Sequence, residues 1–198
     1  MDQAKARAGR EVSRAHVESH ALQLFDEHGV EGVTVEQICA AAGIAPATFY
    51  RHFGTKDGVL FAYRERFLRV IREAAVAVQP AAEPGEQLKS ILLRFADFLD
   101  QHAEDISLRD SVVARNPVLL PSTLLIQREW ESELACALAH VRGVSATDSK
   151  AWWDAAWGLT VIRAAFRRWR SGDVMTMHQS VTNGFEEGLR ALDRLRAT

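Results

Sequence analysis

The stretch Thr34–Lys56, TVEQICAAAGIAPATFYRHFGTK, predicts two short helices separated by a tight glycine turn. Thr34 and Gln37 have the spacing of a capping box, in which the hydroxyl and the amide side chain each bond the other residue's backbone N–H. A helix over 35–42 follows, and Pro46 opens a second helix of about seven residues, because proline is tolerated in the first helical turn. This arrangement is typical of a helix-turn-helix, whose second helix presents its N-terminal residues to the major groove of DNA.

The sequence on both sides of this motif also predicts helices. Residues 11–28 repeat apolar side chains at helical spacing, and Gly29 stands where a left-handed C-terminal cap is expected. Thr55 caps a predicted long helix over 56–78, and Pro80–Pro84 resembles a joint. The remaining helices are expected near 86–102, 104–115, 121–141, 147–171 and 174–197. We therefore predict an all-α fold of about nine helices.

The overall charge argues against a nucleic-acid binder, but its local distribution does not. The chain has 24 Lys and Arg against 26 Asp and Glu, a formal net charge of -2, whereas proteins that neutralise phosphates usually carry a basic excess. From Gln37 to Lys56, however, there is no acidic residue, while Arg51, His52 and Lys56 are present. This stretch is therefore expected to attract phosphates locally.

The composition excludes several other classes of protein. With 47% hydrophobic and 25% charged residues the chain is in the globular range, and its apolar runs are far shorter than the roughly 20 residues that cross a bilayer. The charged N-terminus lacks a secretory signal, so we expect a cytoplasmic protein. Cys39 and Cys136 lack metal-binding spacing, and His16 and His20 lack a third ligand. We find no catalytic motif and expect no enzyme activity, no cofactor and no metal site.

The helix-turn-helix stretch, preceded by Ala21-x-x-Leu24-Phe25-x-x-x-Gly29, resembles the DNA-binding domain of the TetR family of transcriptional regulators over about residues 10–62. The resemblance implies a DNA-binding domain at 1–55 and a larger helical ligand-binding and dimerisation domain at 56–198, with helix 56–78 as a shared connector. It implies a homodimer that binds a palindromic double-stranded operator and responds to a small-molecule effector.

The resemblance also assigns roles to the residues of the motif. The base-facing residues would be Pro46, Ala47 and Thr48. The phosphate contacts would be Thr34, Tyr50, His52 and Lys56, with Arg51 adding positive charge. The sequence departs from the family at Ala45, where Ser or Thr commonly caps the second helix, and this loss costs on the order of 1 kcal/mol. The basic residues before the first helix, Arg10 among them, have two open interpretations, as a DNA-binding arm or as a solvated terminus.

All five tryptophans lie between residues 130 and 169, in the half that binds the effector in this family. They predict an apolar pocket, although tryptophan also simply fills helical cores. The candidate pocket residues are Phe67, Phe95, Leu99, Leu108, Arg109, Val112, Arg128, Trp130, Trp153 and Trp157, with the two arginines as partners for an anionic effector group. The segment RDSVVARNP at 109–117 and Glu129-Trp130 distantly resemble mycofactocin-type regulators, some of which answer to acyl-CoA.

The last two predicted helices are apolar on more than one face, which calls for a second packing partner. In the TetR family these helices pair across a two-fold axis. The candidate dimer residues are Trp152, Ala156, Val181, Phe185, Leu189 and Leu192. We therefore predict a repressor that a small apolar or acyl-type effector releases from its operator. The alternative, supported by the departure at Ala45, is a helical sensor or interaction protein without operator-specific DNA binding.

Overall fold

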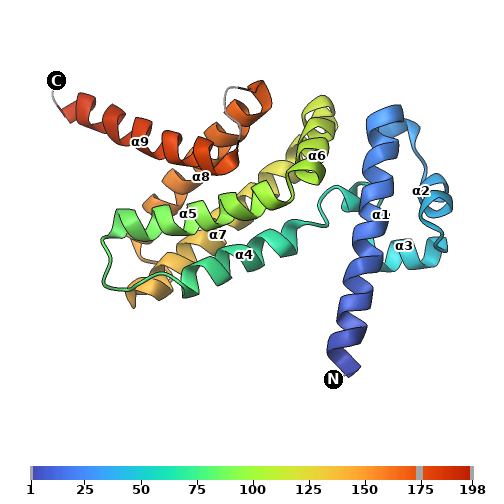
Figure 1. Cartoon of the computed structure of the whole chain (residues 1–198), viewed down its shortest axis with the longest axis horizontal. Helices are drawn as coiled ribbons and strands as arrows, with labels where there is room; N and C mark the ends of the chain where they lie inside the picture. Colours follow the sequence, from blue (N-terminus) through green and yellow to red (C-terminus); the bar gives the residue numbers. More distant parts are fainter. Residues whose placement is uncertain (1, 173–175, 197–198) are drawn as a thin grey trace. The chain divides into compact units, whose positions relative to one another are not determined.

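The computed structural model describes residues 2–172 and 176–196, with side chains described for 14–172, 176–191 and 194. This part of the chain contains α-helices and two short 3-10 helices and no strand, which confirms the all-α prediction (Figure 1). The elements are α1 (Asp2–Gly32), α2 (Val35–Ala42), α3 (Pro46–Phe53), η1 (Asp57–Val59), α4 (Arg64–Val76), α5 (Pro84–Gln101), α6 (Ala103–Arg115), η2 (Pro117–Leu119), α7 (Leu120–Arg142), α8 (Ser149–Ser171) and α9 (Met177–Arg196). No helix in the described part is long and apolar enough to span a membrane.

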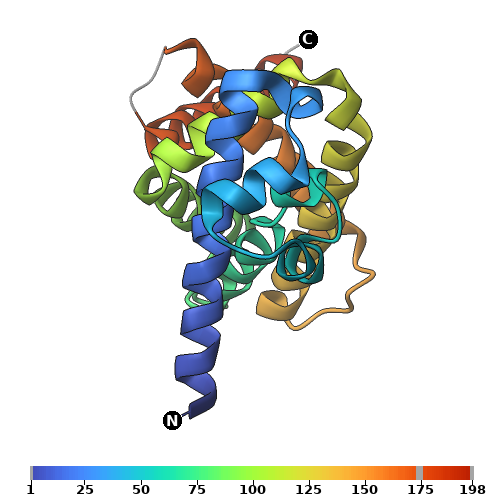
Figure 2. The same cartoon turned by 90° about the vertical axis from the view of Figure 1, so that its right-hand side faces the viewer.

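The chain divides into two compact units. The N-terminal unit comprises Met1–Arg64 and Glu104–Ser122, and the C-terminal unit comprises Glu65–Ala103 and Thr123–Thr198. The N-terminal unit therefore contains most of α6 as well as the helix-turn-helix, and α2 and α3 lie beside α1 in it (Figure 2). The predicted boundary at residue 55 differs from this division, because α6 packs against the N-terminal helices.

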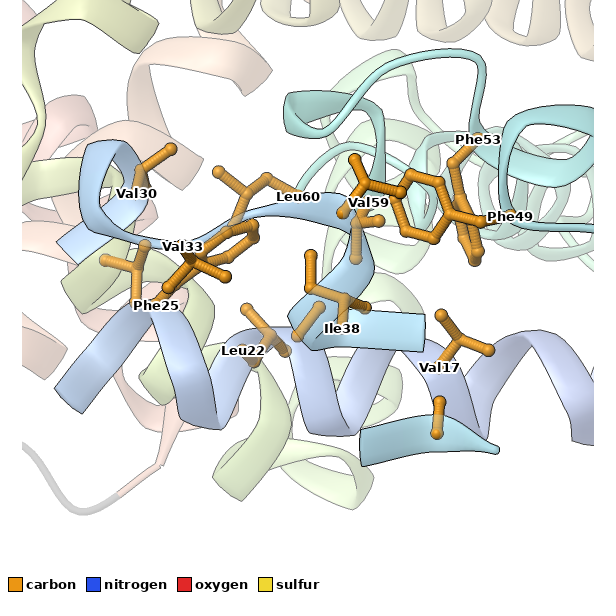
Figure 3. Packing of buried hydrophobic residues seen from close by; sticks show 14 of the residues in the cluster. Val17, Leu22, Phe25, Val30, Val33, Ile38, Phe49, Phe53, Val59 and Leu60 are labelled. Atoms are coloured by element: carbon orange, nitrogen blue, oxygen red, sulfur yellow. The ribbon is translucent and has the colours of Figure 1, made fainter. Parts of the chain in front are cut away.

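The N-terminal unit has its own hydrophobic core, to which every one of its helices contributes (Figure 3). The largest side chains of this core are Leu22, Phe25, Ile38, Phe49, Phe53, Leu60 and Leu119, and Val17 and Val112 also belong to it. Burial of such side chains stabilises a fold by about 1.5–3 kcal/mol each relative to leaving them exposed. The helix-turn-helix packs on α1 and η1 within this core.

The local signals at the helix-turn-helix are confirmed. The Thr34 hydroxyl accepts a hydrogen bond from the Gln37 amide at 3.2 Å, and the Gln37 side chain accepts one from the Thr34 amide at 2.8 Å. Gly43 ends α2 in the left-handed conformation, with φ 64° and ψ 35°. Ala45 is the N-cap of α3 and provides no side-chain hydrogen bond, while Pro46 occupies the first helical position.

The predicted helix over 56–78 is wrong in its first part. Thr55 caps the short η1 instead, by accepting a hydrogen bond from the Gly58 amide, and α4 begins only at Arg64. At this interruption the Val59 and Leu60 carbonyls accept hydrogen bonds from the Arg109 guanidinium, and Val59 also accepts one from the Ala62 amide in a tighter turn. The break in the helix thus coincides with a contact from a side chain 49 residues beyond Leu60.

The first helix is also longer than predicted. It runs from Asp2 to Gly32 and is interrupted at Gly29, whose φ of 73° is positive as expected but whose ψ of 157° is not that of a left-handed cap. The helical turn then continues for three more residues. In the described part, the bounds of α5 to α9 agree with the predicted helices to within three residues.

The C-terminal unit is organised around α5, α8 and α9, which pack against one another (Figure 1). Gly158 on α8 lies at a close approach, since a Cβ atom there would come within 3.0 Å of the Leu88 and Leu134 side chains. Asp100 on α5 accepts hydrogen bonds from the Met177 and His178 amides and so caps α9. These contacts fix the helices that surround the cavity described below.

Candidate functional site

The recognition face is our name for the exposed side of α3, formed by Pro46, Ala47, Tyr50 and Arg51. Phe49 and Phe53 point into the core of the N-terminal unit, their ring centroids 5.1 Å apart (Figure 3). Helical periodicity then turns the four residues of the face toward solvent. Thr48 and His52 are four residues apart, so they lie on the same side of the helix, half-buried at one edge of this face. The structure thus brings together the residues that the sequence predicts for base contact.

The recognition face carries positive charge without neighbouring acids. Arg51 is exposed, His52 lies at its edge, and the sequence from Ile38 to Lys56 contains no Asp or Glu. Tyr50 adds a phenol that is 49% exposed. A surface with an exposed guanidinium in an acid-free stretch of sequence attracts phosphate groups.

Lys56 does not lie where the sequence predicts it. It precedes η1 rather than standing in the first turn of α4, and its ammonium donates a hydrogen bond to the Val33 carbonyl at 2.8 Å. This bond fixes the loop between α1 and α2 to the end of the motif. An ammonium has three donors, so the contact with Val33 is compatible with a phosphate contact.

The two remaining residues predicted for phosphate contact have different outcomes. Thr34 is exposed at the N-terminus of α2, and its hydroxyl serves the capping box. Arg10 lies within α1, but its side chain is outside the described residues.

A buried ion pair holds α6 against the base of this site. Arg109, 7% exposed, donates to a Glu18 carboxylate oxygen at 3.2 Å and to the carbonyls of Val59 and Leu60 at 3.0 and 2.7 Å. Its guanidinium carbon also lies 4.7 Å from the centre of the Tyr63 ring. Burial raises the pKa of Tyr63 to about 12, although Arg109 acts in the opposite direction.

Three predicted pocket residues therefore lie in the N-terminal unit. Arg109 is bonded to Glu18, while Leu108 and Val112 pack on the hydrophobic core of that unit. Their place on α6 corrects the prediction that they line the effector pocket with the tryptophans. Arg128 is an exposed residue of α7 and Trp153 is 77% exposed on α8. Sequence reasoning missed the ion pair because no local pattern indicates that Glu18 and Arg109 meet.

The C-terminal unit contains a small apolar cavity of about 20 Å³. The lining residues are Ile71, Ile91, Leu92, Phe95, Trp130, Glu131, Leu134, Gly158, Leu159 and Ile162. Only Phe95 and Trp130 among the predicted pocket residues belong to this lining. Leu99 is fully buried elsewhere on α5. The aliphatic residues were missed because their helical spacing also fits an ordinary core.

An aromatic cluster forms one end of this cavity. The Phe67 ring lies 5.2 Å from Phe95 and 5.1 Å from Trp130, measured between centroids, and Phe95 lies 6.1 Å from Trp130. These separations are typical of stacked and edge-to-face pairs. Glu131 is the only charged residue of the lining. The cavity therefore suits an apolar molecule.

The predicted dimer residues divide into buried and exposed sets. Val181 and Phe185 are buried inside the C-terminal unit, which corrects their assignment to a surface, because this side of α9 packs on its own protomer. Trp152 and Leu189 are exposed and Ala156 is half-buried. The side chain of Leu192 is outside the described residues.

A groove between α8 and α9 adjoins the exposed set. Its lining residues are Trp157, Thr160, Val161, Ala164, Ala165, Arg168, Ser180, Gly184, Glu187, Gly188 and Arg194. Trp157 thus faces this groove and not the apolar cavity. A Cβ atom at Gly188 would fall 2.1 Å from the Trp157 ring, so the indole can lie there only over a glycine. Arg168 and Glu187 form an ion pair across the groove.

Comparison with known proteins places the helix-turn-helix in a described family. Residues 19–63 match the family model for bacterial regulatory proteins of the tetR family. A Mycobacterium tuberculosis protein named as the mycofactocin biosynthesis transcriptional regulator MftR is 24% identical over 193 residues, which are 96% of this chain and 98% of that protein. The matched segment includes the whole recognition face.

Two further proteins extend the comparison. The HTH-type transcriptional regulator TcmR of Streptomyces glaucescens is 36% identical over 140 residues, which are 65% of this chain and 59% of that protein. Among solved structures, SmeT in complex with triclosan is 19% identical with a TM-score of 0.64, covering 91% of each chain. The structural likeness extends over both compact units and concerns the fold.

Proposed function

The chain belongs to the TetR family of bacterial regulatory proteins and is a DNA-binding transcriptional regulator, and on this premise we propose that it is a dimeric repressor that a small neutral effector releases from a palindromic operator. The observation that carries the proposal is the recognition face, exposed and free of acidic residues on a helix anchored by Phe49 and Phe53. The binding of an operator also assigns the protein to the cytoplasm.

Selection from a random library of duplexes tests the operator part of this proposal. We expect the full chain to enrich inverted repeats, because two protomers related by a two-fold axis bring two copies of α3 to half-sites about one helical turn apart. If the enriched duplexes contain no repeated half-site, or if no duplex is enriched, the result would support the alternative of a helical sensor without operator-specific binding.

The proposed effector is neutral and apolar. Nine of the ten residues that line the cavity are apolar, and the Phe95 and Trp130 rings among them offer stacking partners. The support for an anionic acyl group is weaker, because Arg109 already pairs with Glu18 in the other unit and Arg128 is exposed on α7. SmeT, which shares the fold, is described in complex with triclosan, an aromatic molecule.

A matched pair of probes tests this effector class. Biphenyl is expected to change the fluorescence of the full chain through Trp130 and to raise its melting temperature, because a ligand that binds only the folded state stabilises it. The charged analogue 4-biphenylcarboxylate is expected to do neither, since burying its carboxylate without a partner is unfavourable. Stronger binding of the carboxylate would instead support an acyl-type effector.

The proposed dimer interface is the exposed side of α8 and α9, next to the groove between these two helices. Trp153 is 77% exposed, whereas a tryptophan usually buries most of its surface, and Trp152 and Leu189 are exposed beside the same two helices. Homodimers of this family pair these helices. The single protomer thus leaves an apolar surface that a second copy would cover.

Replacing Trp153 by alanine is expected to weaken the dimer at least thirtyfold, the effect of about 2 kcal/mol that a central interface tryptophan contributes. Sedimentation equilibrium of the full chain measures this dissociation constant. Val144→Ala serves as the control, since Val144 is also an exposed apolar residue but lies in the loop before α8. An unchanged dimer in the Trp153 variant would place the interface elsewhere.

A further inference from the structure

We propose that α3 recognises its half-site by two contacts, from the Ala47 methyl group to a thymine methyl group and from the Arg51 guanidinium to a guanine. This inference rests on the proposed DNA binding and concerns the chemistry by which bases are distinguished. Its basis is the set of functional groups that the recognition face offers and the set that it lacks.

The exposed side chains at the start of α3 offer only hydrocarbon, and the nearest hydroxyl is that of the half-buried Thr48. Ala45, Pro46 and Ala47 are all exposed, and none of these side chains contains a hydrogen-bond donor or acceptor. In helix-turn-helix proteins the N-terminal residues of the second helix contact the base edges. The thymine methyl group is the only apolar group that bases present in the major groove, and alanine is one of its usual partners.

The usual paired contacts to the other two bases lack their residue types. Adenine is usually recognised by the paired hydrogen bonds of Asn or Gln, and cytosine by a carboxylate of Asp or Glu. None of these four residue types occurs from Ile38 to Lys56, so α3 lacks the side chains that usually make these two contacts. Arginine, by contrast, makes the most common specific contact, the paired hydrogen bonds to guanine O6 and N7.

Ala47 and Arg51 occupy the middle of the recognition face. Each is two positions from the buried Phe49, which turns it about 160° away from that residue around the helix axis. The two are four residues apart, which corresponds to about 6 Å along the helix. Base pairs along the DNA axis are about 3.4 Å apart, so a thymine and a guanine about two steps apart are within reach of the two side chains.

Single-atom changes in the DNA test this proposal. The duplex enriched by the full chain is resynthesised with each symmetric pair of thymines replaced by deoxyuridine, which removes only the methyl group, and with each pair of guanines replaced by 7-deazaguanine, which removes the N7 acceptor. At one pair of thymine positions, we expect replacement by deoxyuridine to lower the affinity for the duplex about fifteenfold, or fourfold for each half-site. At one pair of guanine positions, we expect replacement by 7-deazaguanine to lower this affinity at least tenfold for each half-site.

Protein variants assign each penalty to a side chain. With Ala47→Gly the deoxyuridine penalty should disappear, and with Arg51→Met the 7-deazaguanine penalty should disappear, while each variant keeps the other penalty. Keeping the second penalty also shows that the variant is folded and bound in the same register. A deoxyuridine penalty that persists in Ala47→Gly would contradict the assignment to this methyl group.

The possible failures are distinguishable. If no duplex is enriched, the proposed DNA binding and the inference that rests on it are both overturned. If a duplex is enriched but no deoxyuridine position changes the affinity by more than 1.5-fold, the inference alone is overturned and the proposed function stands.

Discussion

Replacing Arg109 by methionine is expected to destabilise the N-terminal unit by about 3–5 kcal/mol, because the change leaves the Glu18 carboxylate buried without its cation. The Leu60 carbonyl loses the donor that Arg109 supplies and the Val59 carbonyl keeps only the Ala62 amide, which adds to the cost. Methionine keeps most of the volume of the side chain, so the effect reports on the lost charge and hydrogen bonds rather than on a cavity.

Two spectroscopic signals separate this effect from a general loss of stability. All five tryptophans belong to the C-terminal unit, so their fluorescence follows that unit, whereas circular dichroism follows the helices of both. We expect Arg109→Met to shift the early part of the circular dichroism transition to lower urea concentrations. The fluorescence transition should stay nearly unchanged. Adding Glu18→Gln should restore part of the loss, and an unchanged dichroism transition in the single variant would contradict the structural role of the pair.

Replacing Phe49 by alanine is expected to cost about 3–5 kcal/mol and to abolish operator binding at concentrations that saturate the natural chain. Phe49 is fully buried and packs on Phe53, and these two rings are the buried anchors of α3. Without one of these rings, α3 no longer presents Ala47 and Arg51 to the major groove of the DNA. Thermal unfolding and a DNA titration of the same sample measure the two effects together.

Phe49→Leu provides the matched comparison. Leucine keeps the site apolar and loses less volume, so the cost should be nearer to 1 kcal/mol and DNA binding should be retained. If the alanine variant binds the operator as tightly as the natural chain, the burial of Phe49 does not position α3 for DNA.

Local chemistry made the helix-turn-helix predictable from the sequence. The capping box of Thr34 and Gln37, the left-handed Gly43 and the first-turn proline of α3 each act within four residues, and each is found as expected. The exposure of Arg51 and Tyr50 follows from the burial of Phe49 by helical periodicity alone. Signals of this kind need no knowledge of which distant segments pack together.

The features that escaped prediction all depend on distant contacts. The helix expected from residue 56 is interrupted where Arg109, far along the chain, bonds the Val59 and Leu60 carbonyls. Val181 and Phe185 have the spacing of an interface stripe, but the same spacing serves packing inside the protomer, where the structure places them. Periodicity identifies an apolar face and does not say what covers it.

The most direct test of DNA recognition by α3 is a fluorescence anisotropy titration of the enriched duplex with the full chain at 50 and 200 mM salt. With Lys56 of two protomers releasing counterions, the logarithm of affinity should fall with the logarithm of salt with a slope of at least about -2 in magnitude, or at least about tenfold between these concentrations. Lys56→Met should reduce that slope by about two. An affinity that does not change with salt, or that is unaffected by both Arg51→Met and Lys56→Met, would contradict the account.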